Sequence, residues 1–186
     1  LLQVSQASRP RGARLPWLRE VADQVRGVAG VDAVGVLGAS LLDGSTRVTG
    51  VRTPPGAKAV RQQAVPVAED FFEAMGIAAV AGRVLTAEEV TSGAAVAAVS
   101  ERAAAELWPD ASPIGQALVS SDGRTSRTVV GVVPEAQYSA LGQSRYGQIY
   151  WPFDGGGPDA TLVVRTAGPL AAVLTAVMAR LRASPA

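Results

Sequence analysis

Apolar and polar positions change their spacing along the chain in a way that predicts strands and helices in alternation. Residues 1–8 place apolar side chains at every second position, which predicts a first strand. Apolar residues then recur every three or four positions over 18–28, so we expect a helix that opens at Pro16 and ends at Gly30. Residues 31–36 resume a strand pattern. The chain is therefore predicted to open as a β-α-β unit.

Turn signals divide the next part of the chain. The Asp43-Gly44 pair precedes a β-rich stretch over 45–51, which predicts a hairpin at this point. A further strand over 61–67 leads into a short helix over 69–75, which Gly76 is expected to end. The apolar anchors of this helix are Phe71, Phe72 and Met75.

Two capping signals define the following helices. Thr86 and Glu89 have the spacing of a capping box, in which each side chain bonds the other residue's free amide. A helical turn is expected there, followed by a loop over 91–93. Ser100 is a favourable N-cap for a helix over 101–108 that follows a short apolar strand.

The last third of the chain returns to strands and closes with a helix. Residues 117–119 and 126–133 flank Asp122-Gly123, which predicts a second hairpin. Further strands are expected over 148–153 and 160–165. The final helix has one apolar stripe, expected to face the core, that comprises Leu170, Val173, Leu174, Val177, Met178 and Leu181.

Composition sets limits on the class of protein. A chain of 186 residues can bury roughly 70% of the surface that its unfolded form exposes, so a stable core needs no metal or disulfide. No apolar run approaches the ~20 residues that a bilayer-spanning helix requires. The absence of cysteine agrees with an extracytoplasmic location. Because the chain begins at Leu1 without a leader, we expect it to be a piece of a longer polypeptide.

Candidate chemistry is sparse. The chain has no histidine and no cysteine, which excludes Ser/His/Asp and Cys/His catalysis and the usual zinc sites. The carboxylate pairs Glu69-Asp70 and Glu88-Glu89 are expected at helix starts, where acidic groups balance the helix dipole. Gly155-Gly156-Gly157 lacks the spacing and the lysine of a phosphate loop. We therefore predict no catalytic, cofactor-binding or metal-binding residues.

Binding surfaces are weakly indicated by the charges and aromatic residues. A net charge of +1, with both signs dispersed, gives no broad field for nucleic acid or anionic lipid. Tyr150, Trp151 and Phe153 lie close together but not among arginines, so no stacking platform for nucleic acid is expected. A small site for a hydrophobic ligand beneath Trp151 or Trp108 remains an alternative to ordinary core packing.

A series of short motifs carries a resemblance to a known family. The motifs occur in the order Phe71-Phe72-Glu73-Ala74-Met75-Gly76-Ile77, Gly82-Arg83, Thr86, Trp108-Pro109, Pro113-Ile114-Gly115-Gln116 and Val129-Val130-Gly131-Val132-Val133. This order resembles the extracytoplasmic core domain of MacB/FtsX-like ABC transporter permeases. The resemblance extends over nearly the whole chain.

The resemblance implies an architecture and a function. The fold class would be α+β, with a porter-like βαβ-type α/β subdomain over 1–85 and 148–186 and a smaller inserted α/β subdomain over 86–147. The domain would be non-catalytic and would lie on the periplasmic or extracellular side of the cell membrane, between membrane helices absent from this sequence. ATP would be hydrolysed on a separate cytoplasmic subunit or domain, and the coupled motion would serve export or force transmission across the membrane.

The same resemblance implies partners. These are a second permease copy, the cytoplasmic ATPase and an adaptor or substrate protein, with no nucleic acid. A free-standing extracytoplasmic domain that binds or senses a ligand is the alternative function. The transported substrate and its direction of movement have no signature in the sequence.

Overall fold

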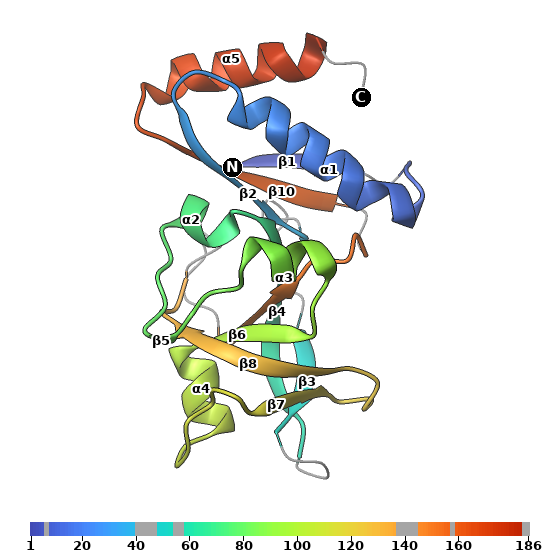
Figure 1. Ribbon diagram of the computed structural model, residues 1–186, viewed down its shortest axis with the longest axis vertical. Helices are drawn as coiled ribbons and strands as arrows, with labels where there is room; N and C mark the ends of the chain where they lie inside the picture. Colours follow the sequence, from blue (N-terminus) through green and yellow to red (C-terminus); the bar gives the residue numbers. More distant parts are fainter. Residues whose placement is uncertain (6–7, 40–47, 54–57, 137–144, 157–158, 184–186) are drawn as a thin grey trace.

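The computed structural model describes residues 1–5, 8–39, 48–53, 58–136, 145–156 and 159–183. Within these residues ten strands join in one sheet and five helices pack with it (Figure 1). The strands are β1 (Leu2–Ser5), β2 (Val31–Leu37), β3 (Val48–Arg52), β4 (Val60–Glu69), β5 (Ala81–Gly82), β6 (Val96–Ser100), β7 (Ala117–Ser120), β8 (Ser126–Val133), β9 (Gln148–Pro152) and β10 (Asp159–Thr166). The helices are α1 (Arg11–Arg26), α2 (Phe71–Met75), α3 (Ala87–Ser92), α4 (Glu101–Leu107) and α5 (Leu170–Ala183). This mixture confirms the α+β class.

Elements β1, α1 and β2 form the expected β-α-β unit, but β10 lies between its two strands in the sheet. Strands β1 and β2 both pair antiparallel with β10, so they run parallel to each other on its two sides. Helices α1 and α5 lie in the same half of the molecule (Figure 1). Leu18, Val21, Ala22 and Val25 give α1 its buried face.

The limits of α1 differ from the expectation. The helix begins at Arg11, and Pro16 lies inside it. Pro16 lacks an N–H for the carbonyl of Gly12, so the second turn of the helix has one hydrogen bond fewer. The helix ends before Gly27, whose N–H donates to the Asp23 carbonyl, and the Val28 N–H donates to the Val25 carbonyl. The predicted end at Gly30 was too late, because Val28 packs against the core from beyond the helix and so continues its apolar spacing.

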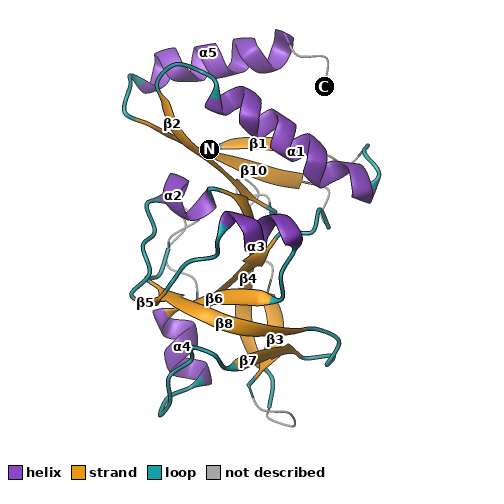
Figure 2. Cartoon of the chain, viewed as in Figure 1, coloured by secondary structure: helices purple, strands orange, loops and turns teal. Residues whose placement is uncertain are grey.

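Strand β4 is the longest strand and extends from one half of the sheet into the other. Its end over residues 67–69 pairs antiparallel with β2. Its start over residues 60–63 pairs antiparallel with β3, and residues 63–67 pair parallel with β9. The two halves in Figures 1 and 2 are therefore connected through one hydrogen-bonded strand.

The hairpin expected around Asp43-Gly44 was wrong in its pairing. Strand β3 pairs with β4 and β7, whereas β2 pairs with β10 and β4. The turn residues themselves lie outside the described residues. The second hairpin is confirmed, since β7 and β8 pair antiparallel across Asp122-Gly123.

Two clusters of buried apolar residues lie on opposite faces of the sheet. Ala97 and Val99 of β6 belong to the cluster that packs against α4, whereas Ala98 between them belongs to the larger cluster with α1 and α2. Ile149 and Tyr150 of β9 divide in the same way. Alternation along each strand therefore supplies both clusters from the same backbone.

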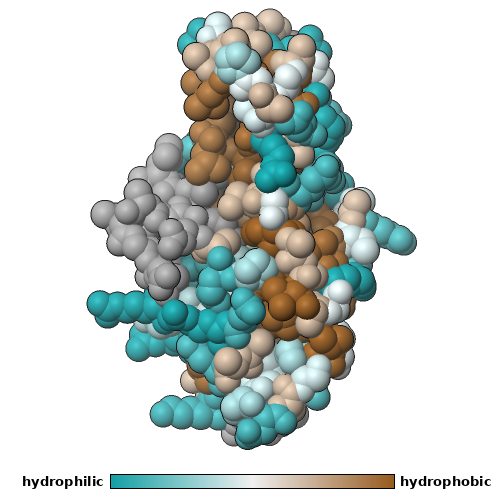
Figure 3. Space-filling model, turned by 90° about the vertical axis from the view of Figure 1, so that its left-hand side faces the viewer, coloured by the Kyte–Doolittle hydropathy of each residue, from teal (hydrophilic) through white to brown (hydrophobic). Residues whose placement is uncertain are grey.

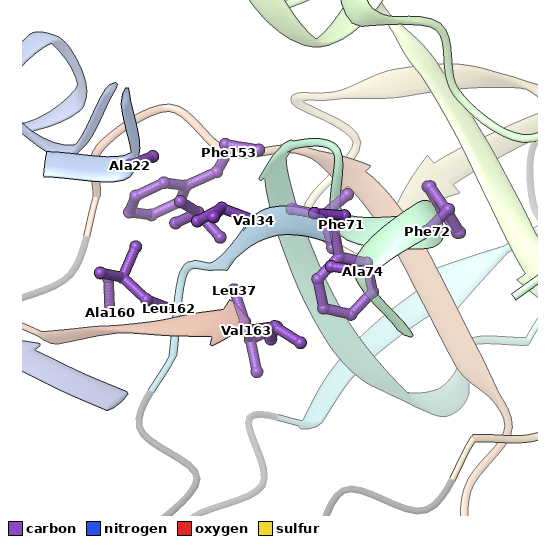
Figure 4. Packing of buried hydrophobic residues seen from close by; sticks show 14 of the residues in the cluster. Ala22, Val34, Leu37, Phe71, Phe72, Ala74, Phe153, Ala160, Leu162 and Val163 are labelled. Atoms are coloured by element: carbon purple, nitrogen blue, oxygen red, sulfur yellow. The ribbon is translucent and has the colours of Figure 1, made fainter. Parts of the chain in front are cut away.

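Helix α2 is held by aromatic residues and by a close backbone approach. Phe71 and Phe72 are buried, and their rings pack against Tyr150 with centroids 6.3 and 5.4 Å apart. Figure 4 shows Phe71 and Ala74 beside β2 and β10. A Cβ on Gly35 would overlap the Phe71 backbone, so glycine allows this contact. Gly76 ends the helix with φ 68°, which confirms the expected cap.

Two other helices depart from the expected limits. Residues 91 and 92 belong to α3 and are not in a loop, and Gly93 ends this helix with φ 65°. In α5 only Val173 and Val177 of the apolar stripe are buried. Leu170 is 72% exposed and Leu174 49% exposed, so the core covers only part of the stripe. The cause is that α5 packs mainly along α1, which covers only part of its apolar face.

The division into a porter-like part over 1–85 and 148–186 and an inserted part over 86–147 stays a prediction. Strands from both ranges belong to one continuous sheet.

Candidate functional site

Charged residues connect α1 to the junction between β4 and α2. Nε of Arg19 lies 3.2 Å from Oε1 of Glu69, and a guanidinium nitrogen of Arg26 lies 3.5 Å from Oε2 of Glu69. Arg26 also contacts Asp70 at 3.3 Å and pairs with Asp23 on its own helix. The Glu69 side chain is only 18% exposed. These contacts bind α1 to the end of the strand that connects the two halves.

The backbone of Glu69 is in an unusual conformation. Its φ of 54° is the only positive value at a non-glycine position among the described residues. A side chain in this left-handed region costs roughly 1 kcal/mol or more, and such residues persist where surrounding contacts hold them. Here the contacts are the two arginines of α1. The expectation that Glu69-Asp70 belongs to a helix start was therefore wrong for Glu69, which ends β4.

The second carboxylate pair has two different roles. Glu89 accepts two hydrogen bonds of 2.7 Å from the Arg83 guanidinium and one of 2.9 Å from the Thr86 N–H. The Thr86 hydroxyl accepts from the Glu89 N–H, which confirms the capping box. The Arg83 hydrogen bonds, with those from Thr86, lower the pKa of Glu89 to about 2, although partial burial opposes them. Glu88 is exposed at the first turn of α3.

Arg83 also lies where the backbone of β5 meets β8. The Arg83 N–H donates to the Val130 carbonyl at 3.0 Å. A Cβ on Gly131 would overlap the Arg83 carbonyl oxygen, so only glycine permits this approach. The Gly-Arg motif and the Val-Val-Gly-Val-Val motif, far apart in sequence, are therefore parts of one contact.

The ends of the central strands carry a polar cluster that is structural. Ser100 is fully buried, caps α4 through the Ala103 N–H, and accepts from the Gln148 N–H at 2.9 Å. The Gln148 side chain accepts from the Tyr150 hydroxyl at 2.8 Å and forms two hydrogen bonds with the Ala136 backbone. Because Tyr150 is buried, its ring is not available to stack on a nucleic-acid base.

A cavity of about 340 Å³ lies beside Trp151, one of the two tryptophans named as alternatives to core packing. Its lining differs from a hydrophobic ligand site, since Arg124, Arg127 and Asp154 border it. The Arg127 guanidinium lies over the Trp151 ring, 4.7 Å from its centroid. The other candidate, Trp108, packs against the cluster beneath α4. No pattern in the sequence indicated that Arg127 and Trp151, on different strands, would meet.

The outer surface also carries exposed apolar residues. Figure 3 shows them gathered across the middle of one face between more polar regions. Val80 is 59% exposed, and Ile114 lies beside Gly82, close to where a Gly82 Cβ would be.

The described residues hold no cluster of metal ligands and no membrane-spanning helix. None of them form a group of three or more metal-ligating acidic, histidine or cysteine side chains. None of their helices has the length and apolar character needed to span a bilayer.

The sequence matches the family model described as the MacB-like periplasmic core domain over residues 1–184. The chain belongs to this family. The resemblance inferred from the motifs is thereby confirmed, and the domain is an extracytoplasmic domain of a MacB-like ABC transporter permease. No curated protein sequence matches it.

Solved structures share the fold of this core domain. The periplasmic region of MacB from Actinobacillus actinomycetemcomitans is 16% identical, with a TM-score of 0.64 over 88% of this chain and 72% of that one. The extracellular domain of the ABC-type transporter YknZ from Gram-positive bacteria is 17% identical, with a TM-score of 0.62 over 84% of this chain and 76% of that one. At these identities the likeness concerns the fold alone.

Proposed function

We propose that this core domain is a non-catalytic body that couples ATP-driven motion of its permease to export or to force transmission across the membrane. Family membership supports a permease that acts with an ATPase. We propose further that the ATPase is a separate cytoplasmic subunit or domain. We also propose that the permease works beside a second copy of itself, together with an adaptor or substrate protein.

The observation that carries this proposal is the strand β4. One strand pairs with β2 at one end and with β3 and β9 at the other, so a displacement of either half moves the other through hydrogen bonds. The Arg19 and Arg26 contacts with Glu69 fix α1 to the end of the same strand. A domain built in this way transmits displacement as a rigid body, as a coupling element must.

The positions of the first and last described elements support the same function. Strand β1 and helix α5 lie in the same half of the molecule (Figure 1). Membrane helices on either side of the domain would then approach it from one side. We place the domain on the periplasmic or extracellular face of the cell membrane, with its opposite half reaching outward.

Distance measurements in the full-length permease, reconstituted with its ATPase in nanodiscs, test the proposal. These 186 residues contain no cysteine, so labels can be placed singly or in pairs once any cysteine elsewhere in the permease and ATPase is replaced. Spin labels at E20C on α1 and A105C on α4 report on one domain, because both positions are exposed and lie in opposite halves. A single A105C label reports on the distance between two copies.

We expect the distance within one domain to stay constant between nucleotide-free and ATP-bound states, and the distance between copies to change. The double-labelled and the single-labelled permeases are measured in separate samples. The double-labelled permease is diluted with unlabelled permease, so that only distances within one domain are recorded. A change within the domain, or no change between copies, would contradict a rigid coupling body. A permease that yields no distance between copies would contradict the paired arrangement.

A further inference from the structure

The cavity beneath Trp151 has features that core packing and strand pairing do not explain. It opens between the β7–β8 hairpin, the segment before β6 and the end of β9. Its walls combine the Trp151 ring with Pro152 and the small residues Ala94 and Ala95. Beside these apolar groups lie the guanidinium groups of Arg124 and Arg127. The cavity therefore offers an apolar wall and two positive charges.

Arg127 forms no ion pair within 4.0 Å among the described residues, although the charge of Asp154 acts on it. Its guanidinium lies against the Trp151 ring and is half-buried. Its one hydrogen bond among the described residues goes to the Thr125 hydroxyl at 3.3 Å, and no described carboxylate lies within 4.0 Å of it. Burial lowers the pKa of Arg127, and the charge of Asp154 partly offsets that effect. A guanidinium has five N–H donors, so most of them remain available to a ligand.

The nearby carboxylate and the second arginine set the net charge of the cavity. Asp154 accepts a hydrogen bond from the Gly156 N–H at 2.9 Å, which holds it at the rim. Arg124 is 86% exposed and makes only a loose contact of 3.9 Å with Asp122. The lining holds Arg124, Arg127 and one carboxylate, Asp154, while Asp122 beside Arg124 lies outside the lining. An anion entering the cavity would therefore find attraction from both arginines.

We propose that this cavity binds a carboxylate attached to a small apolar body. The two oxygens of a carboxylate match the planar fork of Arg127, whose orientation the Trp151 ring already fixes. The apolar body would lie against Pro152 and the alanines, while Arg124 closes over the entrance. The inference does not depend on the coupling function, since it concerns a separate surface of the domain.

Binding is tested by NMR on the 186-residue chain with cyclohexanecarboxylate as the probe. The indole N–H signal of Trp151 is assigned with W151F and followed during titration. Cyclohexanecarboxamide is the matched neutral control, and acetate reports on a carboxylate without an apolar body. A tripeptide with a free carboxyl terminus, compared with its amidated form, shows whether the natural source is a small acid or a peptide end.

We expect a saturable shift with cyclohexanecarboxylate and none with the carboxamide. R127Q should weaken binding by about tenfold or more, because hydrogen bonds to a charged group are lost. R124Q should weaken it less, and R182Q, on the exposed face of α5, should leave it unchanged. R127K keeps the charge but loses the planar fork, so it should fall between the wild type and R127Q.

Three results would overturn the proposal: no saturable shift, equal binding of the carboxylate and the carboxamide, or unchanged binding in R127Q. Circular dichroism and thermal unfolding establish that each variant is folded. If R127Q does not fold, the same reasoning applies to R127K. None of these results bears on the distance measurements in the permease.

Discussion

Nε of Arg19 lies 3.2 Å from the carboxylate of Glu69. Glu69 is also the single non-glycine residue with a positive φ among the described residues. The ion pair and the backbone conformation depend on each other. The pair holds Glu69 in a conformation that is unfavourable by itself, and that conformation directs the carboxylate toward α1. The first prediction follows from this relationship.

Removal of the Glu69 charge should destabilise the domain. We expect E69Q to lower the free energy of unfolding by about 1 kcal/mol, near the upper limit for exposed pairs, since two arginines share this carboxylate. E20Q, an exposed residue of α1, is the control and should change little. Urea unfolding measures both. A loss in E69Q no larger than in E20Q would show that the pair does not stabilise the junction.

The Arg83–Glu89 pair should make stability depend on acid pH. The pKa of Glu89 is lowered from its ordinary 4.5 to about 2 in the folded state, so its stabilising effect is present above about pH 5 and is lost as pH falls toward 2. E89Q should therefore reduce stability at pH 7 and flatten the pH dependence in this range.

The control for E89Q is E88Q, whose side chain is exposed one position away. Thermal unfolding from pH 7 to pH 2.5 would compare the three proteins. Because Arg83 is about half exposed, added salt should weaken the effect. Parallel pH profiles for the wild type and E89Q would argue against the pair.

Gly131 should not accept a side chain. A Cβ there would overlap the Arg83 carbonyl oxygen, so G131A should separate β5 from β8 and destabilise the domain by ~1–3 kcal/mol. Gly12, in α1, has no atom near its Cβ position, so G12A should be neutral or stabilising by up to ~1 kcal/mol. Denaturant unfolding gives both values, and hydrogen exchange at the Val80 and Arg83 amides, which donate to the Val132 and Val130 carbonyls, shows whether β5 has separated.

Phe72 and Leu170 should differ widely in how much their truncation destabilises the domain. Phe72 is buried against Tyr150, so F72A should lower the free energy of unfolding by ~3–5 kcal/mol. Leu170 is 72% exposed, so L170A should change it by less than about 0.5 kcal/mol. Equal effects would mean that the apolar face of α5 is covered in solution.

Local signals in the sequence were sufficient for three caps, although not for the two ends of α1. Gly76, Thr86 and Ser100 were all assigned correctly, because a cap depends on bonds to residues within about four positions. The pairing of β10 between β1 and β2 could not be foreseen, since it joins the two ends of the chain.

Contacts between side chains distant in sequence were equally hidden. Arg26 and Asp70 are 44 positions apart, and nothing in either neighbourhood indicates the other. The stripe of α5 shows a related limit, because a pattern identifies the apolar face of a helix without stating how much of it a neighbour covers. The family motifs succeeded where periodicity did not, since they combine these distant constraints.

The alternation of Ala97, Ala98 and Val99 between two clusters has a consequence for how the domain unfolds. A strand that serves both sides cannot release one without exposing the other to water. Heating or denaturant should therefore unfold the whole domain in a single cooperative transition. No partly unfolded species should accumulate in which a protease could cleave one half while the other stays folded.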